Sequence, residues 1–68
     1  MKRITKEREE RNMSQADLSY TLRISPALIS KIERGKHYPC KPSQRKLSNF
    51  FNMSIDELLE EISEEEVD

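Results

Sequence analysis

Every lysine and arginine of this chain lies between Lys2 and Lys46, so the side chains that can bind an anion are confined to one part of the sequence. That part holds twelve basic residues against five acidic ones, a net charge of +7, whereas residues 47–68 hold eight acidic residues and no basic one. The formal net charge of −1 hides this sorting and by itself argues against a polyanionic ligand. We expect one basic face and one acidic end, a dipole that orients the domain toward a polyanion. Composition alone leaves open the alternative that the charges only solvate the surface.

Side chains suited to catalysis or to metal binding are few. The chain has one histidine, His37, and one cysteine, Cys40, whereas a structural zinc site needs four ligands. A lone cysteine can form a disulfide only with another chain, and the sequence has neither a nucleophile beside a base nor a glycine-rich phosphate loop. We therefore predict no enzymatic activity, no metal and no cofactor, and we interpret both residues as ordinary loop residues.

Length and composition predict the scaffold that must position the basic side chains. A chain of 68 residues has room for one domain with a small core. The sequence is 34% hydrophobic and 37% charged and lacks the alternation of β-strands, which is typical of a small all-α domain. No stretch is apolar for the length of a membrane span, and Met1 leads into charged residues, so we expect a cytoplasmic protein without membrane association.

The segment from Ser14 to Gly35 predicts two short helices joined by a tight corner. Ser14 is a good N-cap, with Asp17 three residues on as an approximate capping box. Ser25 is the next N-cap, Pro26 suits the first helical position, and Gly35 ends the second helix. The apolar residues expected inside are Leu18, Leu22, Ile24, Ile29 and Ile32. This layout is typical of a helix-turn-helix.

Helices are also predicted on both sides of this segment. Residues 2–11 form a first helix, with Ile4 and Arg8 on its inner face. Two prolines mark a loop after Gly35, and a fourth helix follows from about Pro42 to Phe51. Its apolar face is formed by Leu47, Phe50 and Phe51, with Asn52 as the C-cap.

The C-terminal part predicts a fifth helix that begins with a capping box of Ser54 and Glu57. Apolar residues then recur at helical spacing: Ile55, Leu58, Leu59 and Ile62. We expect part of this stripe to close the core and the rest to form a surface for a dimer or another partner. Residues 1–62 then make up the domain, and the acidic tail 63–68 frays.

A set of residues at fixed spacings resembles the helix-turn-helix of the Cro/CI-type family of phage repressors and bacterial regulators: Arg8, Gln15, Leu18, Ser19, Ile29, Ser30, Glu33, Arg34 and Gly35. The resemblance extends from Ile4 to Leu59. It implies a compact, all-α, five-helix domain of the phage-repressor DNA-binding type, in which helices 2 and 3, about residues 14–35, form the helix-turn-helix. It also implies a structural ion pair between Arg8 and Glu33. The chain departs from the family pattern at Arg23, where the turn usually has glycine, and at Ser19, where alanine is usual.

In function, the resemblance implies a sequence-specific, double-stranded DNA-binding transcriptional regulator, predicted here to be a repressor. Its third helix enters the major groove, and a homodimer binds a palindromic operator. The residues expected to face base edges are Ser25, Pro26, Ala27, Ser30 and Lys31. Lys31 is the strongest candidate, because lysine donates to guanine O6 and N7. Phosphate contacts are expected from Gln15, Arg11, Arg34, Lys36, Tyr38 and Lys41.

A fold does not determine a function, so a second class stays open. The chain is alternatively a protein-interaction module, or an antitoxin-like protein that binds its partner through the acidic C-terminal helix. A salt-dependent gel shift on DNA supports the first class, and binding to a protein alone supports the second. The resemblance also implies a bacterial, phage or mobile-element origin.

Overall fold

Three helices of this computed structural model begin directly after a capping serine of the sequence. The structure describes residues 1–63, and these contain five helices: α1 (Arg3–Glu10), α2 (Gln15–Leu22), α3 (Pro26–Glu33), α4 (Lys41–Phe51) and α5 (Ile55–Leu58). Ser14 Oγ accepts the Asp17 N–H at 2.9 Å, and Asp17 Oδ2 accepts the Ser14 N–H at 2.9 Å, so the predicted capping box of α2 is complete. Ser25 caps α3 with Pro26 in the first turn, as predicted.

Several of these helices end at or next to a residue whose backbone has the left-handed conformation. Asn12, Arg23 and Asn52 have φ values of 57°, 56° and 56°, and Gly35 has φ 73°. Arg23 ends α2 in this conformation, which costs a non-glycine residue about 1 kcal/mol. At Gly35 a Cβ atom would lie 3.3 Å from Lys2 Cε, so glycine permits both the positive φ and the close approach of Lys2.

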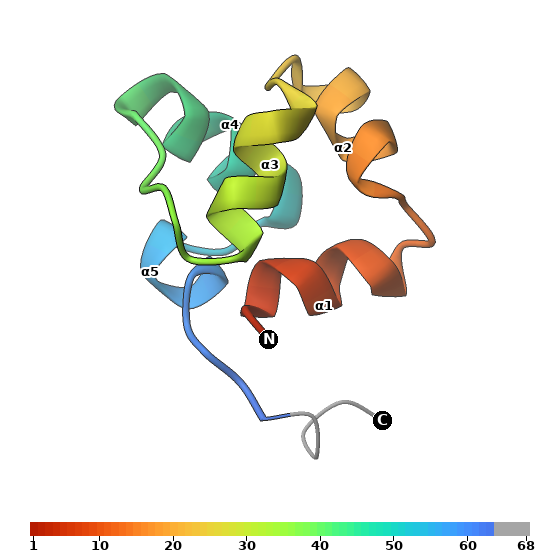
Figure 1. The fold of residues 1–68 in the computed structure, drawn as a ribbon. Helices are drawn as coiled ribbons and strands as arrows, with labels where there is room; N and C mark the ends of the chain where they lie inside the picture. The colour runs from red at the N-terminus through yellow and green to blue at the C-terminus, as the bar shows by residue number, and fades with distance from the viewer. Residues whose placement is uncertain (64–68) are drawn as a thin grey trace.

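The core lies where all five helices meet. Its buried residues come from every helix and from the turn between α2 and α3: Ile4, Leu18, Ile24, Ile29, Ile32, Leu47, Phe51 and Leu58. The predicted all-α five-helix fold is confirmed, with α2 packed against α3 as a helix-turn-helix requires. Figure 1 shows α3 at the front, with α2 beside its N-terminal end and the connection to α4 along its other side.

The predicted course of the chain after Leu58 is wrong. The α5 helix has only four residues, and the chain continues as an extended segment that pairs with the N-terminus. The Arg3 N–H donates to Glu60 O at 2.9 Å, and the Ile62 N–H donates to Met1 O at 2.8 Å. Pairing with residues 1–3 satisfies backbone groups that a longer helix would have satisfied internally.

The burial of Leu58 and Ile62 narrows the predicted dimer or partner surface to Ile55 and Leu59. Leu58 and Ile62 are 0% and 4% exposed inside the protomer, so they contact the core and are not available to a partner. Ile55 and Leu59 are half-buried. Of the predicted tail 63–68, residues 64–68 lie outside the described residues.

The other boundaries differ from the predicted ones by one residue. The first helix begins at Arg3 and not at Lys2, and α4 begins at Lys41 and not at Pro42. Cys40 precedes α4 without a side-chain cap. The longest described helix, α4, has 11 residues, and none of the described helices has the length and apolar character to cross a membrane.

Candidate nucleic-acid interface

A buried ion pair fixes the C-terminal end of α3 to α1. The Arg8 guanidinium binds the Glu33 carboxylate through two bonds, Nε to Oε2 at 2.7 Å and Nη2 to Oε1 at 3.0 Å. Arg8 Nη1 also donates to Met13 O at 2.7 Å, which ties the connection between α1 and α2 to the same group. The hydrogen bond to Glu33 raises the pKa of Arg8 above its ordinary value. The two residues are thus placed as the family resemblance implied.

Two further side chains donate to the same carboxylate. Thr5 Oγ1 and Gln15 Nε2 each lie 3.0 Å from Glu33 Oε1. Gln15, which the sequence assigned to phosphate binding, therefore begins α2 with its amide anchored to the end of α3. An amide nitrogen has two N–H groups, so one remains for a ligand. The sequence signal for Thr5 was its place three residues before Arg8, on the same helical face.

The α3 helix has one buried side and one exposed side. Ile29 and Ile32 are 0% and 1% exposed, whereas Pro26, Ala27 and Lys31 are exposed. The other two predicted base contacts differ: Ser30 is half-buried, and Ser25 is exposed but its Oγ already accepts the Leu28 N–H at 3.2 Å. The predicted base-facing residues thus extend from the N-cap of α3 to Lys31 in its last turn, and all of them except the half-buried Ser30 are exposed.

Basic residues predicted to contact phosphate surround this surface unequally. Arg34, Lys36 and Lys41 are exposed. Arg11 is more constrained, because its Nη1 donates to the carboxylate and carbonyl of Glu7 at 2.9 Å and its guanidinium lies 5.0 Å from the centre of the Phe51 ring. Of the predicted phosphate contacts, Arg34, Lys36 and Lys41 thus take part in no ion pair within residues 1–63 and lie at or after the C-terminal end of α3.

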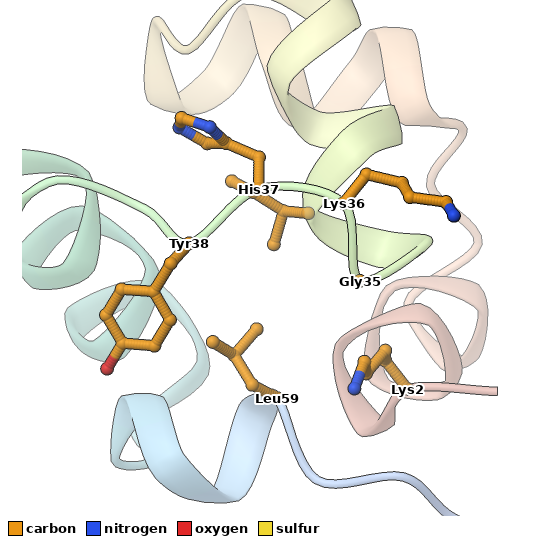
Figure 2. A pocket seen from close by; sticks show the side chains of 7 residues that line it. Lys2, Gly35, Lys36, His37, Tyr38 and Leu59 are labelled. Atoms are coloured by element: carbon orange, nitrogen blue, oxygen red, sulfur yellow. The ribbon is translucent and has the colours of Figure 1, made fainter.

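Tyr38 lies on the side of the connection that faces α5. Its ring is 60% exposed, and Figure 2 shows it directed toward Leu59 of the α5 end, while His37 points the opposite way. Tyr38 lines a surface hollow of about 330 Å³ together with Lys2, Ile32, Gly35, Lys36, His37 and Leu59. None of the predicted base-facing residues lines this hollow. Sequence reasoning missed it, because its walls come from α1, α3, the loop and α5.

A second exposed aromatic residue also escaped the sequence analysis. Tyr20 is 88% exposed on α2, so it does not contribute to the core. A tyrosine among the apolar residues of a helix is usually interpreted as core, and only the three-dimensional packing shows otherwise.

His37 and Cys40 stay separate loop side chains. The Cys40 thiol lies 3.4 Å from Ser43 Oγ, and this hydrogen bond holds the pKa of the thiol below its ordinary value. Within residues 1–63, no three potential metal-binding side chains come together.

The α3 helix packs on α2 with one side in the core, and its outer side is exposed with basic residues nearby. This arrangement defines a helix-turn-helix DNA-binding fold. The chain belongs to the helix-turn-helix domain family, whose sequence pattern residues 1–64 match. Family membership confirms the resemblance inferred from the motif, and it places the chain among binding domains and not enzymes.

One curated relative is the HTH-type transcriptional activator BcrR of Enterococcus faecalis, which is 44% identical over 52 residues. The match covers 76% of this chain and 26% of the relative, so the chain spans about a quarter of that protein's length. No solved structure gives a significant match.

Proposed function

We propose that this domain is a transcriptional regulator that binds double-stranded DNA sequence-specifically by inserting α3 into the major groove. The observation that carries the proposal is the division of α3 into a buried isoleucine side and an exposed side with Lys31. A recognition helix needs this division, because its inner side must be held by the core while the residues of its outer side contact base edges.

Lys31 is the main base-reading residue in this proposal. Its ammonium donates to guanine O6 and N7, whereas Pro26 and Ala27 offer only apolar contact with a thymine methyl group. Ser25 and Ser30 add hydroxyl groups next to the groove. Direct readout therefore involves few side chains, and water and DNA shape supply the remaining specificity.

Phosphate contacts come from both sides of α3. On one side we place the free N–H of Gln15 and the backbone amides that begin α2, and on the other Arg34, Lys36 and Lys41. Arg11 contributes from its fixed position over Phe51. The exposed Tyr38 hydroxyl is the remaining phosphate contact in this proposal.

Two protomers bind one operator in this proposal. A domain of this size buries too little surface for tight specific binding, so a homodimer binds two half-sites of a palindrome about one helical turn apart. The acidic residues of α5 then lie away from the phosphates.

Whether the protein represses or activates transcription depends on where its operator lies relative to the promoter. The sequence-based prediction of a repressor holds for an operator that overlaps the promoter, whereas the relative named above is a transcriptional activator. A promoter fused to a reporter gene, with and without the protein, distinguishes the two. Because a transcriptional regulator acts on DNA inside the cell, we propose that this protein acts in the bacterial cytoplasm and originates from a bacterium, a phage or a mobile element.

The acidic end supports a second candidate function, binding to a protein partner. Asp56, Glu57 and Glu60 are exposed around α5. In this alternative the partner is a basic protein surface, as for an antitoxin, and DNA is not bound.

Selection from random DNA at several salt concentrations tests the proposal. Neutralising roughly five phosphates per protomer gives a slope of log K against log salt of about −4 to −5 per protomer. A single enriched sequence motif together with such a slope supports DNA binding. No enrichment and a slope near zero contradict it and favour the protein-binding candidate.

A further inference from the structure

Arg23 occupies a backbone position that arginine does not favour. It ends α2 with φ 56° and ψ 44°, in the left-handed region that residues with a Cβ atom enter at a cost in stability. The other described residues with positive φ are Asn12, Gly35 and Asn52, and both of these residue types adopt this conformation more readily. The corner between α2 and α3 therefore holds a strained residue where glycine or asparagine would be more stable.

The Arg23 side chain has no partner within residues 1–63. The residue is exposed, and its guanidinium takes part in no hydrogen bond, ion pair or ring contact of the described chain. Only its backbone N–H is bonded, to Ser19 O. Strained residues cluster where a side chain has a function, so a guanidinium without a partner at such a position indicates an anion outside the protomer.

The corner lies next to the residues proposed to contact bases. Arg23 precedes Ser25, the N-cap of α3, by two residues, which span at most about 7 Å. Figure 1 shows this corner at the outer edge of the molecule, at the N-terminal end of α3. The major groove is about 12 Å wide, so a helix end at its centre has a phosphate backbone about 6 Å away on either side. A long side chain at the corner is therefore well placed to meet a phosphate.

We propose that Arg23 binds a backbone phosphate at the edge of the groove that α3 enters. The inference rests on the DNA binding proposed above and adds a contact that the sequence analysis did not predict. A guanidinium donates two parallel N–H bonds to phosphate oxygens, so it fixes the phosphate in a defined geometry. Such a contact does not read the bases directly, and it positions the N-terminal end of α3 over them.

Stability and DNA binding should respond to a change of Arg23 with opposite signs. Arg23→Gly and Arg23→Asn both accept the left-handed backbone, and both remove the charge. The glycine variant is expected to raise the melting midpoint by about 2–8 °C, and the asparagine variant is not expected to lower it. Each variant is expected to weaken DNA binding about threefold to tenfold at about 0.15 M salt, because one phosphate contact is lost. Arg23→Lys keeps the charge, so most of the affinity should return.

The test combines thermal melts with binding isotherms of the full chain on a DNA duplex that it selects from random sequence. Fluorescence anisotropy measures the affinity from about 0.05 to 0.3 M salt. In Arg23→Gly and Arg23→Asn the slope of log K against log salt should become shallower by about 1 per protomer. The selected consensus should stay the same, because the lost contact is to the backbone.

Two control variants separate this contact from general effects of backbone and charge. Asn52→Gly changes another left-handed helix end and keeps every charge, so its DNA affinity should equal that of the unmodified chain. Arg3→Gln removes one positive charge near the N-terminus, which Figure 1 shows at the opposite end of the molecule from the corner. Its effect on affinity should stay below about twofold, because salt screens charges over about 8 Å.

An unchanged salt slope in both Arg23→Gly and Arg23→Asn would overturn the inference, and so would an equal change of slope in Arg3→Gln. A lower melting midpoint in both Arg23 variants with unaltered DNA binding would assign the arginine to the negative end of the α2 dipole instead. If the unmodified chain selects no sequence, the proposed function and this contact fail together. If it selects one and the Arg23 variants bind equally well, only the contact fails.

Discussion

Removing the Glu33 carboxylate is expected to unfold most of the domain. This carboxylate accepts hydrogen bonds from Thr5, Arg8 and Gln15, and its side chain is 5% exposed. In Glu33→Ala the Arg8 guanidinium keeps its charge, because the pKa of arginine is far above any usable pH, but it loses its two bonds to Glu33. It keeps the bond to Met13 O and a longer contact of 4.0 Å with the exposed Glu9 carboxylate. The charge is 10% exposed and cannot recover its full hydration without opening the structure.

The expected cost is comparable with the stability of the whole domain. Breaking a buried ion pair by removing one partner costs about 3–5 kcal/mol, and a core of this size supplies about the same amount. Since 1 kcal/mol shifts the midpoint of a small domain by about 4–8 °C, the variant should lack a cooperative transition above room temperature. Replacing both partners, Arg8→Met with Glu33→Leu, removes the isolated charge and should recover part of the loss.

Thermal unfolding followed by circular dichroism measures this effect. Glu10→Ala is the matched control, because it removes an exposed carboxylate that lies 3.5 Å from Lys6 on the same helix, a pair worth about 0.5 kcal/mol or less. The reasoning is refuted by a Glu33→Ala melt that superimposes on that of the unmodified protein. A double variant less stable than Glu33→Ala would show that the isolated charge is not the cause.

Three further predictions concern charged side chains outside the Arg8–Glu33 pair. Arg23→Gly is expected to raise the unfolding free energy by about 0.5–1 kcal/mol, because glycine adopts φ 56° without strain, and an unchanged melting midpoint would contradict this. Lys31→Ala is expected to relax the DNA consensus at one base position while the melt stays the same, and an unaltered consensus in random-sequence selection would count against its role. Hydrogen bonds from Ser14 and from the N-terminal ammonium hold the pKa values of Asp17 and Glu61 below their ordinary values. These groups stabilise the fold above the unfolded pKa and lose that effect as pH falls through the folded pKa. Urea midpoints should therefore fall from about pH 5 downward, and Asp17→Asn with Glu61→Gln should make that fall shallower.

Local chemistry made most of the fold predictable. Ser14, Ser25 and Ser54 start helices because their hydroxyl groups cap free amides, and each was recognisable from the residues that follow it. The end of α4 at Asn52 is equally local, because asparagine tolerates the left-handed backbone. Such signals depend on a few neighbouring residues, so they can be found without knowing the tertiary structure.

The segment after Leu58 shows where this kind of reasoning fails. The spacing of Leu58 and Ile62 fits a helix, and both residues are in fact buried, but the backbone between them leaves the helix to pair with residues 1–3. The competing bonds come from the opposite end of the chain. Periodicity identified which side chains are inside, whereas the backbone conformation depended on a partner that the local sequence does not contain.

The candidate site was predictable to a similar extent. The exposed side of α3 followed from the positions of Ile29 and Ile32, and the +7 segment indicated a polyanion. The contact between Gln15 and Glu33 did not follow, because it joins residues 18 positions apart through an amide that a phosphate would use equally well. The direction of Tyr38 depends likewise on the position of α5.

Different residues of α3 therefore serve stability and the proposed DNA recognition, and Glu33 affects both. Lys31 is exposed, so we expect its replacement to change DNA binding and to leave the core intact. Glu33 holds α1 through Arg8 and the first residue of α2 through Gln15, so one carboxylate both stabilises the core and positions the amide that we propose binds phosphate. A loss of DNA binding in a Glu33 variant consequently says nothing about DNA contact by itself. Gln15→Ala separates the two effects, because it removes the amide and keeps both bonds between Arg8 and Glu33 available.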